Sequence, residues 1–211
     1  SLRMSSEQKY KEGDGPYLQW EASNRDELLV FTDRQQCYKT RLSDFDDTKA
    51  SVLGDYLPTK LGMDPEERAV WACIPGDYSG QLLFFFENGK AARVELSAYQ
   101  TRTRRKKLTG AYSDKSPLVA AFLLIEDFEA AVISTEGRCV VFHTASLNPK
   151  TTRSTQGVNV MTLKPKYRVE KVLPLDRTAI VNAARYRARS LPVSGALLKE
   201  EGRGEEQLTL L

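Results

Sequence analysis

The chain has 211 residues, of which 41% are hydrophobic and 28% charged, and its formal net charge is +3. This length is sufficient to bury a core as one domain or as a compact array of repeats. No apolar run approaches the ~20 residues that a membrane helix requires, and no signal peptide precedes the patterned region, so we expect a cytoplasmic protein. The three cysteines are isolated, which favours reduced, structural thiols over a disulfide or a zinc site.

Positive charge is concentrated in the middle of the chain. Residues 90–168 hold 14 Lys and Arg against 6 Asp and Glu, whereas residues 1–89 hold 10 against 16 and residues 169–211 hold 7 against 6. A fold that is basic in one part only has the charge pattern expected of a protein that binds a polyanion on one surface.

The first third of the chain predicts one hairpin and a further strand. Residues 1–15 are polar, and residues 17–20 predict a strand that leads into the patterned region. Residues 27–45 contain two strand-like segments on either side of a turn near Gln35, and residues 69–74 predict another strand. Because acidic side chains are frequent between them, we expect this part to bind anions weakly.

The clearest hairpin spans residues 81–99. An apolar run is followed by Asn88 and Gly89, and from Ala92 to Ala98 apolar residues then alternate with polar ones. Asn-Gly between two such runs predicts a type I′ turn with positive φ at both residues. Phe84, Phe85 and Phe86 precede this turn, so we interpret them as core and not as a platform for stacking bases.

A third hairpin is predicted at residues 129–147, with its turn at Gly137. The apolar run at residues 118–125 before it permits a helix, but its length and the repeat favour a strand. Residues 158–163 are rich in β-branched residues and predict a strand.

The pattern fades beyond Pro174. Residues 179–189 are compatible with a short helix or with an extended strand. The last stretch, residues 199–211, is acidic; it is either a solvated tail or a competitor for a basic surface.

The three hairpins are copies of one unit. Gln35, Gly89 and Gly137 hold the same turn position and are separated by 54 and 48 residues. Repeats of about 40 to 50 residues built from short strands indicate propeller blades. We therefore predict an all-β fold with a lead-in at residues 1–25, blades at residues 26–75, 76–124 and 125–174, and a C-terminal extension at residues 175–211.

A basic segment follows the second hairpin and a weaker one follows the third. When the segments are aligned on Gly54, Gly110 and Gly157, Lys106 and Arg153 stand where the first repeat has Ala50. Such a patch is often only a solvated face, but its recurrence in a repeated loop favours a binding surface. The candidate residues are Arg102, Arg104, Arg105, Lys106, Lys107, Lys115, Lys150, Arg153, Lys164, Lys166 and Arg168.

Three stretches together resemble a known family: YLQWEASNRDELLVFTDRQQCYKTRLSDF, GQLLFFFENGKAARVELSAYQTRTRRKKLTG and STEGRCVVFHTASLNPKTTRSTQGVNVMTLK. Their strand pairs, basic loops and Thr-Gln-Gly-Val motif are similar to the C-terminal domain of bacterial type IIA topoisomerase A subunits, which are those of DNA gyrase and of topoisomerase IV. The likeness covers about residues 17–164. The Gln-Arg-Arg-Gly-Gly-Lys-Gly box of true gyrases, which normally lies in an earlier blade, does not occur in this sequence.

The resemblance implies a β-pinwheel, a propeller-like ring whose blades exchange strands, of which the three repeats would be the final part. It implies binding and bending of double-stranded DNA over the rim of the second and third blades, through phosphates and without base reading. The parent would be an ATP-dependent type II topoisomerase with two B subunits and a second A subunit, using ATP and Mg²⁺ outside this chain. The alternative is a protein-interaction module whose basic loops dock an acidic partner.

Catalysis within this chain has little support in the sequence. His143 is the single histidine and lies in a predicted strand, so no Ser-His-Asp or Cys-His arrangement is indicated. No phosphate-binding Gly-Lys-Ser/Thr loop is present, and we predict no catalytic residue, metal site or cofactor in this part of the protein.

Overall fold

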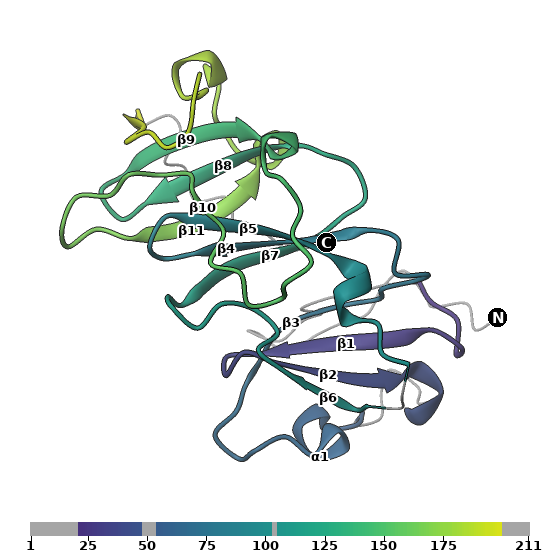
Figure 1. Ribbon diagram of the computed structural model, residues 1–211. Helices are drawn as coiled ribbons and strands as arrows, with labels where there is room; N and C mark the ends of the chain where they lie inside the picture. The colour runs from purple at the N-terminus through teal and green to yellow at the C-terminus, as the bar shows by residue number, and fades with distance from the viewer. Residues whose placement is uncertain (1–20, 48–53, 103–104, 200–211) are drawn as a thin grey trace.

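The computed structural model describes residues 21–47, 54–102 and 105–199. These residues form three four-stranded sheets in which neighbouring strands are antiparallel. The sheets follow one another along the molecule from the purple strands to the green ones (Figure 1). The predicted all-β, β-pinwheel class is confirmed. The predicted strand at residues 17–20 and the acidic tail from residue 200 lie outside the described residues.

We name the sheets blades 1 to 3 and give their strands in spatial order. Blade 1 contains β3 (Ala69–Cys73), β1 (Glu27–Thr32), β2 (Gln36–Arg41) and β6 (Lys107–Thr109). Blade 2 contains β10 (Val158–Asn159), β5 (Lys90–Glu95), β4 (Gln81–Phe86) and β7 (Leu118–Leu124). Blade 3 contains β11 (Val169–Pro174), β8 (Glu129–Ser134), β9 (Arg138–His143) and β12 (Ala196–Leu197).

The helical elements are short. One α-helix, α1 (Leu57–Leu61), precedes β3, and it was not predicted from the sequence. It begins with a proline in its first turn and ends at Gly62, whose φ of 66° supplies the left-handed cap that favours glycine. The remaining turns are the 3₁₀ helices η1 (Leu42–Asp44), η2 (Leu96–Tyr99), η3 (Thr144–Ser146), η4 (Leu175–Arg177) and η5 (Ala183–Arg185).

The three predicted hairpins are confirmed, and they share one loop geometry. Gln35, Gly89 and Gly137 have φ values of 55°, 84° and 80°, and each donates its backbone N–H to the carbonyl three residues before. The type I′ turn predicted at Asn88 is wrong, because positive φ is confined to Gly89. The loop has three residues and ends in a left-handed one, which is the next most common way to close a hairpin.

The outer strand of each blade is contributed by the repeat that follows. In Figure 1 the teal β6 lies beside the much bluer β2, although the whole second hairpin separates them in sequence. In the same way β10, which follows the third hairpin, pairs with β5, and β12 pairs with β9. A blade is therefore not a continuous stretch of sequence. The ranges 76–124, 125–174 and 175–211 each contain the outer strand of the blade before.

The segments after the third hairpin are less regular than the sequence pattern suggested. The strand predicted at residues 158–163 is limited to β10 and an isolated bridge from Met161 to Val193. Residues 179–189 form neither a regular helix nor a strand, but contain η5 and a bridge from Arg187 to Val141. The strand predicted at residues 118–125 is confirmed as β7.

Alternate residues of the central strands face the two neighbouring blades. Phe84 and Phe86 pack in one cluster with Phe31 of blade 1, whereas Phe85 packs with Phe142 of blade 3. The three consecutive phenylalanines are at most 2% exposed, so the prediction that they form the core is confirmed. Burying each ring contributes about 1.5–3 kcal/mol. A strand buried on both faces explains why these runs are continuously apolar.

The two ends of the array are covered by the chain itself. On the far side of blade 1, Leu28, Val30 and Tyr38 pack with Met63, which follows α1. On the far side of blade 3, Ile133 and Val141 pack with Tyr186 and Leu198 from the C-terminal segment. Residues 175–199 are therefore a packed part of the fold.

A buried carboxylate is part of blade 1. Glu67 is 3% exposed and accepts hydrogen bonds from Thr32 Oγ1 at 2.5 Å and from the Tyr38 hydroxyl at 2.8 Å. Burial raises the pKa of Glu67, but these hydrogen bonds outweigh it, so the net pKa is lowered. The charged form of Glu67 therefore stabilises the folded state.

Glu67→Gln should weaken the fold and reduce its sensitivity to acid. Because the folded-state pKa is the lower one, the stabilisation is present above the unfolded pKa of about 4.3 and disappears as the pH falls through the folded pKa. We expect a loss of about 1–3 kcal/mol at pH 7 and a shallower fall in the free energy of unfolding below pH ~4. Urea denaturation over a pH series measures both. If the free energy of unfolding depended on pH in the same way for the variant and the wild type, this role of the Glu67 carboxylate would be contradicted.

Gly157→Ala should be far more disruptive than Gly62→Ala. Both glycines have positive φ, 72° and 66°, but a Cβ on Gly157 would lie 2.0 Å from the carbonyl oxygen of Ala91, whereas one on Gly62 meets nothing within 4 Å. The left-handed conformation costs about 1–2 kcal/mol in either case, and the clash adds about 1–3 kcal/mol for Gly157. Equal losses of stability for the two variants in thermal or urea unfolding would show that β10 does not pack closely against β5.

Candidate nucleic-acid interface

The basic segments lie on the outer edges of the blades. Lys39, Arg93 and Val141 each stand four residues after the left-handed turn residue of their hairpin. The backbones of these three residues bond to those of Lys106, Lys150 and Ala188 respectively, each at 2.8 Å. We call the corresponding segments, residues 101–109, 148–159 and 185–197, the rim segments. They occupy equivalent places on blades 1, 2 and 3.

The most basic rim segment lies on blade 1, not on blade 2. Arg102, Arg105 and Lys106 are exposed and, together with Arg41, line an open hollow whose acidic members are Glu27 and Asp44. Exposed cations are therefore found on the first blade as well, next to the acidic side chains predicted there. The exchange of β6 moves the charge of the second repeat onto the edge of the first blade. Arg104 lies outside the described residues.

Cations of this segment remain available to a ligand. None of Arg102, Arg105 and Lys106 forms an ion pair with a described residue. Lys107 extends over the ring of Tyr38, with Nζ 5.5 Å from the ring centroid, and its side chain is exposed as well. Hydrogen bonds from the Arg41 backbone and from Thr40 lower the pKa of Asp44, so a carboxylate remains at the edge of the hollow.

The two candidates on the rim segment of blade 2 differ in their surroundings. Lys150 is exposed, and its backbone bonds to Arg93 and Glu95 of β5. Arg153 instead donates to the carbonyls of Ala98 at 2.9 Å and Thr109 at 3.4 Å. Its guanidinium therefore connects a turn of blade 2 with the outer strand of blade 1, and its contacts are mainly internal.

The remaining candidates lie at the other end of the hairpins. Lys164 pairs with Glu136 at 2.7 Å and Arg168 with Glu87 at 3.6 Å, and both acids belong to hairpin loops. Lys115 belongs to the connection beside the second hairpin loop, where Ser116 Oγ accepts from Asn88 N at 3.0 Å, and Lys166 is exposed between Lys164 and Arg168. A six-residue strand spans ~20 Å. The candidates thus form two groups, one on the rim segments and one beside the hairpin loops.

Sequence reasoning missed the cations of the third rim segment. Arg185, Arg187 and Arg189 are exposed on blade 3. Arg187 forms a bidentate pair with Glu129 at 2.6 and 2.9 Å, while neither of the other two is in an ion pair with a described residue. The sequence contains three arginines at alternate positions here. The repeat pattern is no longer recognisable in this part of the chain, so the sequence did not reveal that they lie on the rim. Arg41 was missed because it lies in an acidic stretch.

Groups suited to catalysis or metal binding are not assembled in the described residues. His143 is exposed, and its Nδ1 accepts from the backbone N–H of Ala145 at 3.3 Å. Within the described ranges no three His, Cys, Asp or Glu side chains come together as a metal site. Cys37, Cys73 and Cys139 are free and buried, and burial raises the pKa of the Cys139 thiol to about 12. The described part of the chain contains no helix long and apolar enough to cross a membrane.

A family model matches two segments of the chain. The model, described as DNA gyrase C-terminal domain, beta-propeller, covers residues 26–51 and 130–176, which include the first and third hairpins. No curated protein matches the chain by sequence.

Solved structures share the fold. The C-terminal domain of DNA topoisomerase IV has a TM-score of 0.64 and 22% identity over 74% of this chain and 49% of its own length. The DNA gyrase A C-terminal domain has a TM-score of 0.56 and 18% identity, covering 86% and 64% of the two chains. For the E. coli ParC C-terminal domain the values are 0.64, 13%, 86% and 80%. The chain therefore spans about half to two thirds of the first two structures.

At these identities the structural likeness shows the fold, while the family model matches the sequences around the first and third hairpins. Both agree with the resemblance read from the three hairpins. Two segments of the chain therefore match the model of the DNA gyrase C-terminal domain, and the whole array has the fold of the gyrase A and topoisomerase IV C-terminal domains.

Proposed function

We propose that this chain binds double-stranded DNA along its rim segments, through phosphates and without reading base sequence. The observation that carries the proposal is the repetition of exposed cations at equivalent places on consecutive blades. Arg102, Arg105 and Lys106 lie on blade 1, Lys150 on blade 2, and Arg185 and Arg189 on blade 3. Such cations neutralise phosphates and release counterions, which gives affinity with a steep dependence on salt.

Base reading has no support among the described residues. The one α-helix has five residues, so it offers no recognition helix for the major groove. Phe84, Phe85 and Phe86 are buried, and the exposed aromatic residues Tyr56 and Tyr167 are far apart in sequence and lie outside the rim segments. We therefore propose that the chain contacts only the sugar-phosphate backbone of the DNA.

A duplex that follows the rim has to bend. Smooth bending of a short site costs on the order of 1–6 kcal/mol, which contacts spread over several blades would offset. Each further rim segment lengthens the contact with the DNA backbone, and none of these contacts depends on the base sequence.

The parent protein, by family resemblance, is the A component of a type II topoisomerase. We propose that it acts in the cytoplasm with two B subunits and a second A subunit, and that ATP and Mg²⁺ serve strand passage in other parts of that assembly. This chain would hold and orient a DNA segment for that reaction. The chain shares its fold with the C-terminal domains of both topoisomerase IV and gyrase A.

Reversing charge on the rim should strongly weaken DNA binding, while the same reversal at the hairpin loops should not. The rim variant is Arg102→Glu, Arg105→Glu and Lys106→Glu; the matched control is Lys115→Glu, Lys164→Glu and Lys166→Glu, with the same change in net charge. Fluorescence anisotropy with a labelled mixed-sequence duplex over a salt series measures both. We expect the rim variant to bind roughly 100-fold more weakly and its log-log salt slope to fall by about 3.

The control should retain most of the wild-type affinity. Equal losses in both variants would mean that net charge alone matters and would contradict a defined rim. Weak wild-type binding even at low salt would instead favour the module that docks an acidic protein partner.

A further inference from the structure

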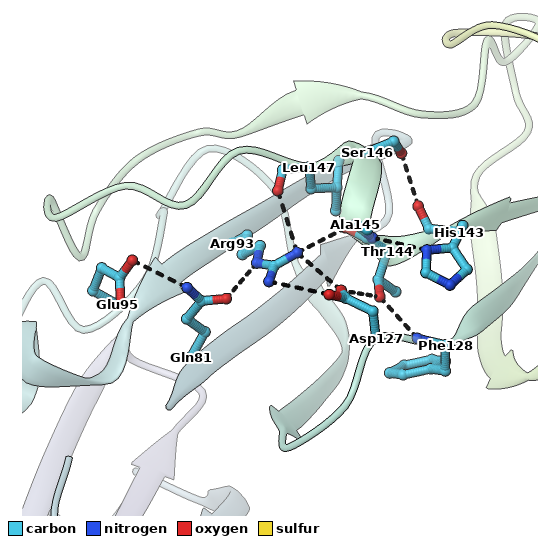
Figure 2. A network of polar contacts seen from close by, with 10 residues as sticks. All are labelled: Gln81, Arg93, Glu95, Asp127, Phe128, His143, Thr144, Ala145, Ser146 and Leu147. Atoms are coloured by element: carbon cyan, nitrogen blue, oxygen red, sulfur yellow. Dashed lines mark hydrogen bonds and ion pairs between the residues drawn. The ribbon is translucent and has the colours of Figure 1, made fainter. Parts of the chain in front are cut away.

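A largely buried arginine joins blade 2 to blade 3. Arg93 lies in β5 with its side chain 12% exposed, and Figure 2 shows it at the centre of a polar network. Its Nη1 donates to Asp127 Oδ1 at 2.9 Å, to the Thr144 carbonyl at 3.1 Å and to the Leu147 carbonyl at 3.4 Å. All three acceptors belong to the third repeat. One side chain of blade 2 therefore holds the connection before β8 and the turn after β9.

The partners of Arg93 are themselves held in place. Gln81 accepts from Arg93 Nε at 2.5 Å and donates to Glu95 at 3.1 Å, which fixes the guanidinium from its own blade. Asp127 also accepts from Thr144 Oγ1 at 2.7 Å. That hydrogen bond, followed by the charge of Arg93, lowers the pKa of Asp127. The carboxylate is therefore ionised at neutral pH, and the ion pair with Arg93 is intact.

The junction between blades 1 and 2 repeats this arrangement with a lysine. Lys39 stands at the position equivalent to Arg93 and donates to the Tyr99 carbonyl at 3.1 Å and to Thr101 Oγ1 at 3.2 Å. Tyr99 and Leu147 are each ten residues after their turn residue, so the accepting carbonyl is equivalent too. The carboxylate nearest to Lys39, Glu27 at 3.9 Å, belongs to its own blade. Among the described residues, an ion pair from this strand position to the following repeat is thus found at the second junction and not at the first.

Apolar contacts also hold these blades together, but they do so without direction. The packing of Phe85 with Phe142 tolerates small rotations, because burial depends on area and not on angle. A guanidinium with fixed donor directions restricts the geometry much more strongly. Arg93 therefore restricts the angle between blades 2 and 3, together with the more exposed ion pair of Arg168 with Glu87.

We propose that Arg93 is a positioning residue that fixes blade 3 against blade 2 and thereby sets the curvature of a duplex bound along the rim. The second half of this inference rests on the proposed function. Arg93 itself does not touch the DNA in this account, since its donors are directed at protein acceptors.

The first half can be tested without DNA. Ser97 on η2 of blade 2 and Glu170 on β11 of blade 3 are exposed, and the three native cysteines are buried, so Ser97→Cys and Glu170→Cys accept spin labels selectively. We expect a narrow distance distribution between the labels in the otherwise unchanged protein. It should be shifted or broadened by Arg93→Met, and less so by Arg93→Lys. Arg34→Met is the matched control, because Arg34 pairs with Glu66 within blade 1.

The second half of the inference, the effect of Arg93 on DNA curvature, is tested with a duplex labelled at both ends with fluorescent dyes. Energy transfer between the dyes reports bending when the duplex is saturated with protein. We expect Arg93→Met to change the transfer efficiency while the affinity stays within about 3-fold and the salt slope is unchanged; Arg34→Met should match the wild type. If Arg93→Met does not fold, Arg93→Lys carries both measurements.

Each outcome is decisive. An unchanged distance distribution overturns the positioning role, and a changed distribution with unchanged transfer overturns the curvature role alone. A wild-type protein that does not bind duplex overturns the proposed function and with it the curvature role, while the distances still decide whether Arg93 fixes blade 3.

Discussion

The exchange of outer strands between repeats is the constraint on which the rest of this structure depends. A three-stranded blade would expose the edges of β2, β5 and β9, and each edge is instead completed by the following repeat through β6, β10 or β12. The exchange requires close backbone contacts, which explains why Gly157 lies against Ala91. It also means that no described blade is complete without the next segment of chain.

The same exchange determines where the charge lies. A basic segment that follows the second hairpin becomes the edge of blade 1, and the segment after the third becomes the edge of blade 2. The acidic first repeat thus acquires the most basic edge of the molecule. Between the blades, Lys39 and Arg93 use neighbouring carbonyls to hold consecutive repeats together. The cations inside the junctions make internal contacts, whereas Arg102, Arg105 and Lys106 on the rim are exposed.

Local features were predictable from the sequence, and features that depend on long-range pairing were not. Gln35, Gly89 and Gly137 identified three hairpins because turn chemistry acts over a few residues, and Phe84 to Phe86 were recognisable as core from their position. The basic segment that contains β6 was placed on the second blade, since pairing across many residues leaves no periodicity. Arg153 was nominated for charge, but its guanidinium is engaged with Ala98 and Thr109. Arg185 and Arg189 were missed because β12 has only two residues.

The chemical reactivity of individual lysines tests most directly whether DNA contacts the rim segments or the hairpin loops. Brief acetylation of the protein with and without duplex, followed by mass spectrometry, reports the accessibility of each amine in one experiment. We expect DNA to protect Lys106 and Lys150 on the rim and to leave Lys115, Lys164 and Lys166 by the hairpin loops as reactive as before. Protection of the second group without the first would contradict the assignment of the DNA path to the exchanged strands.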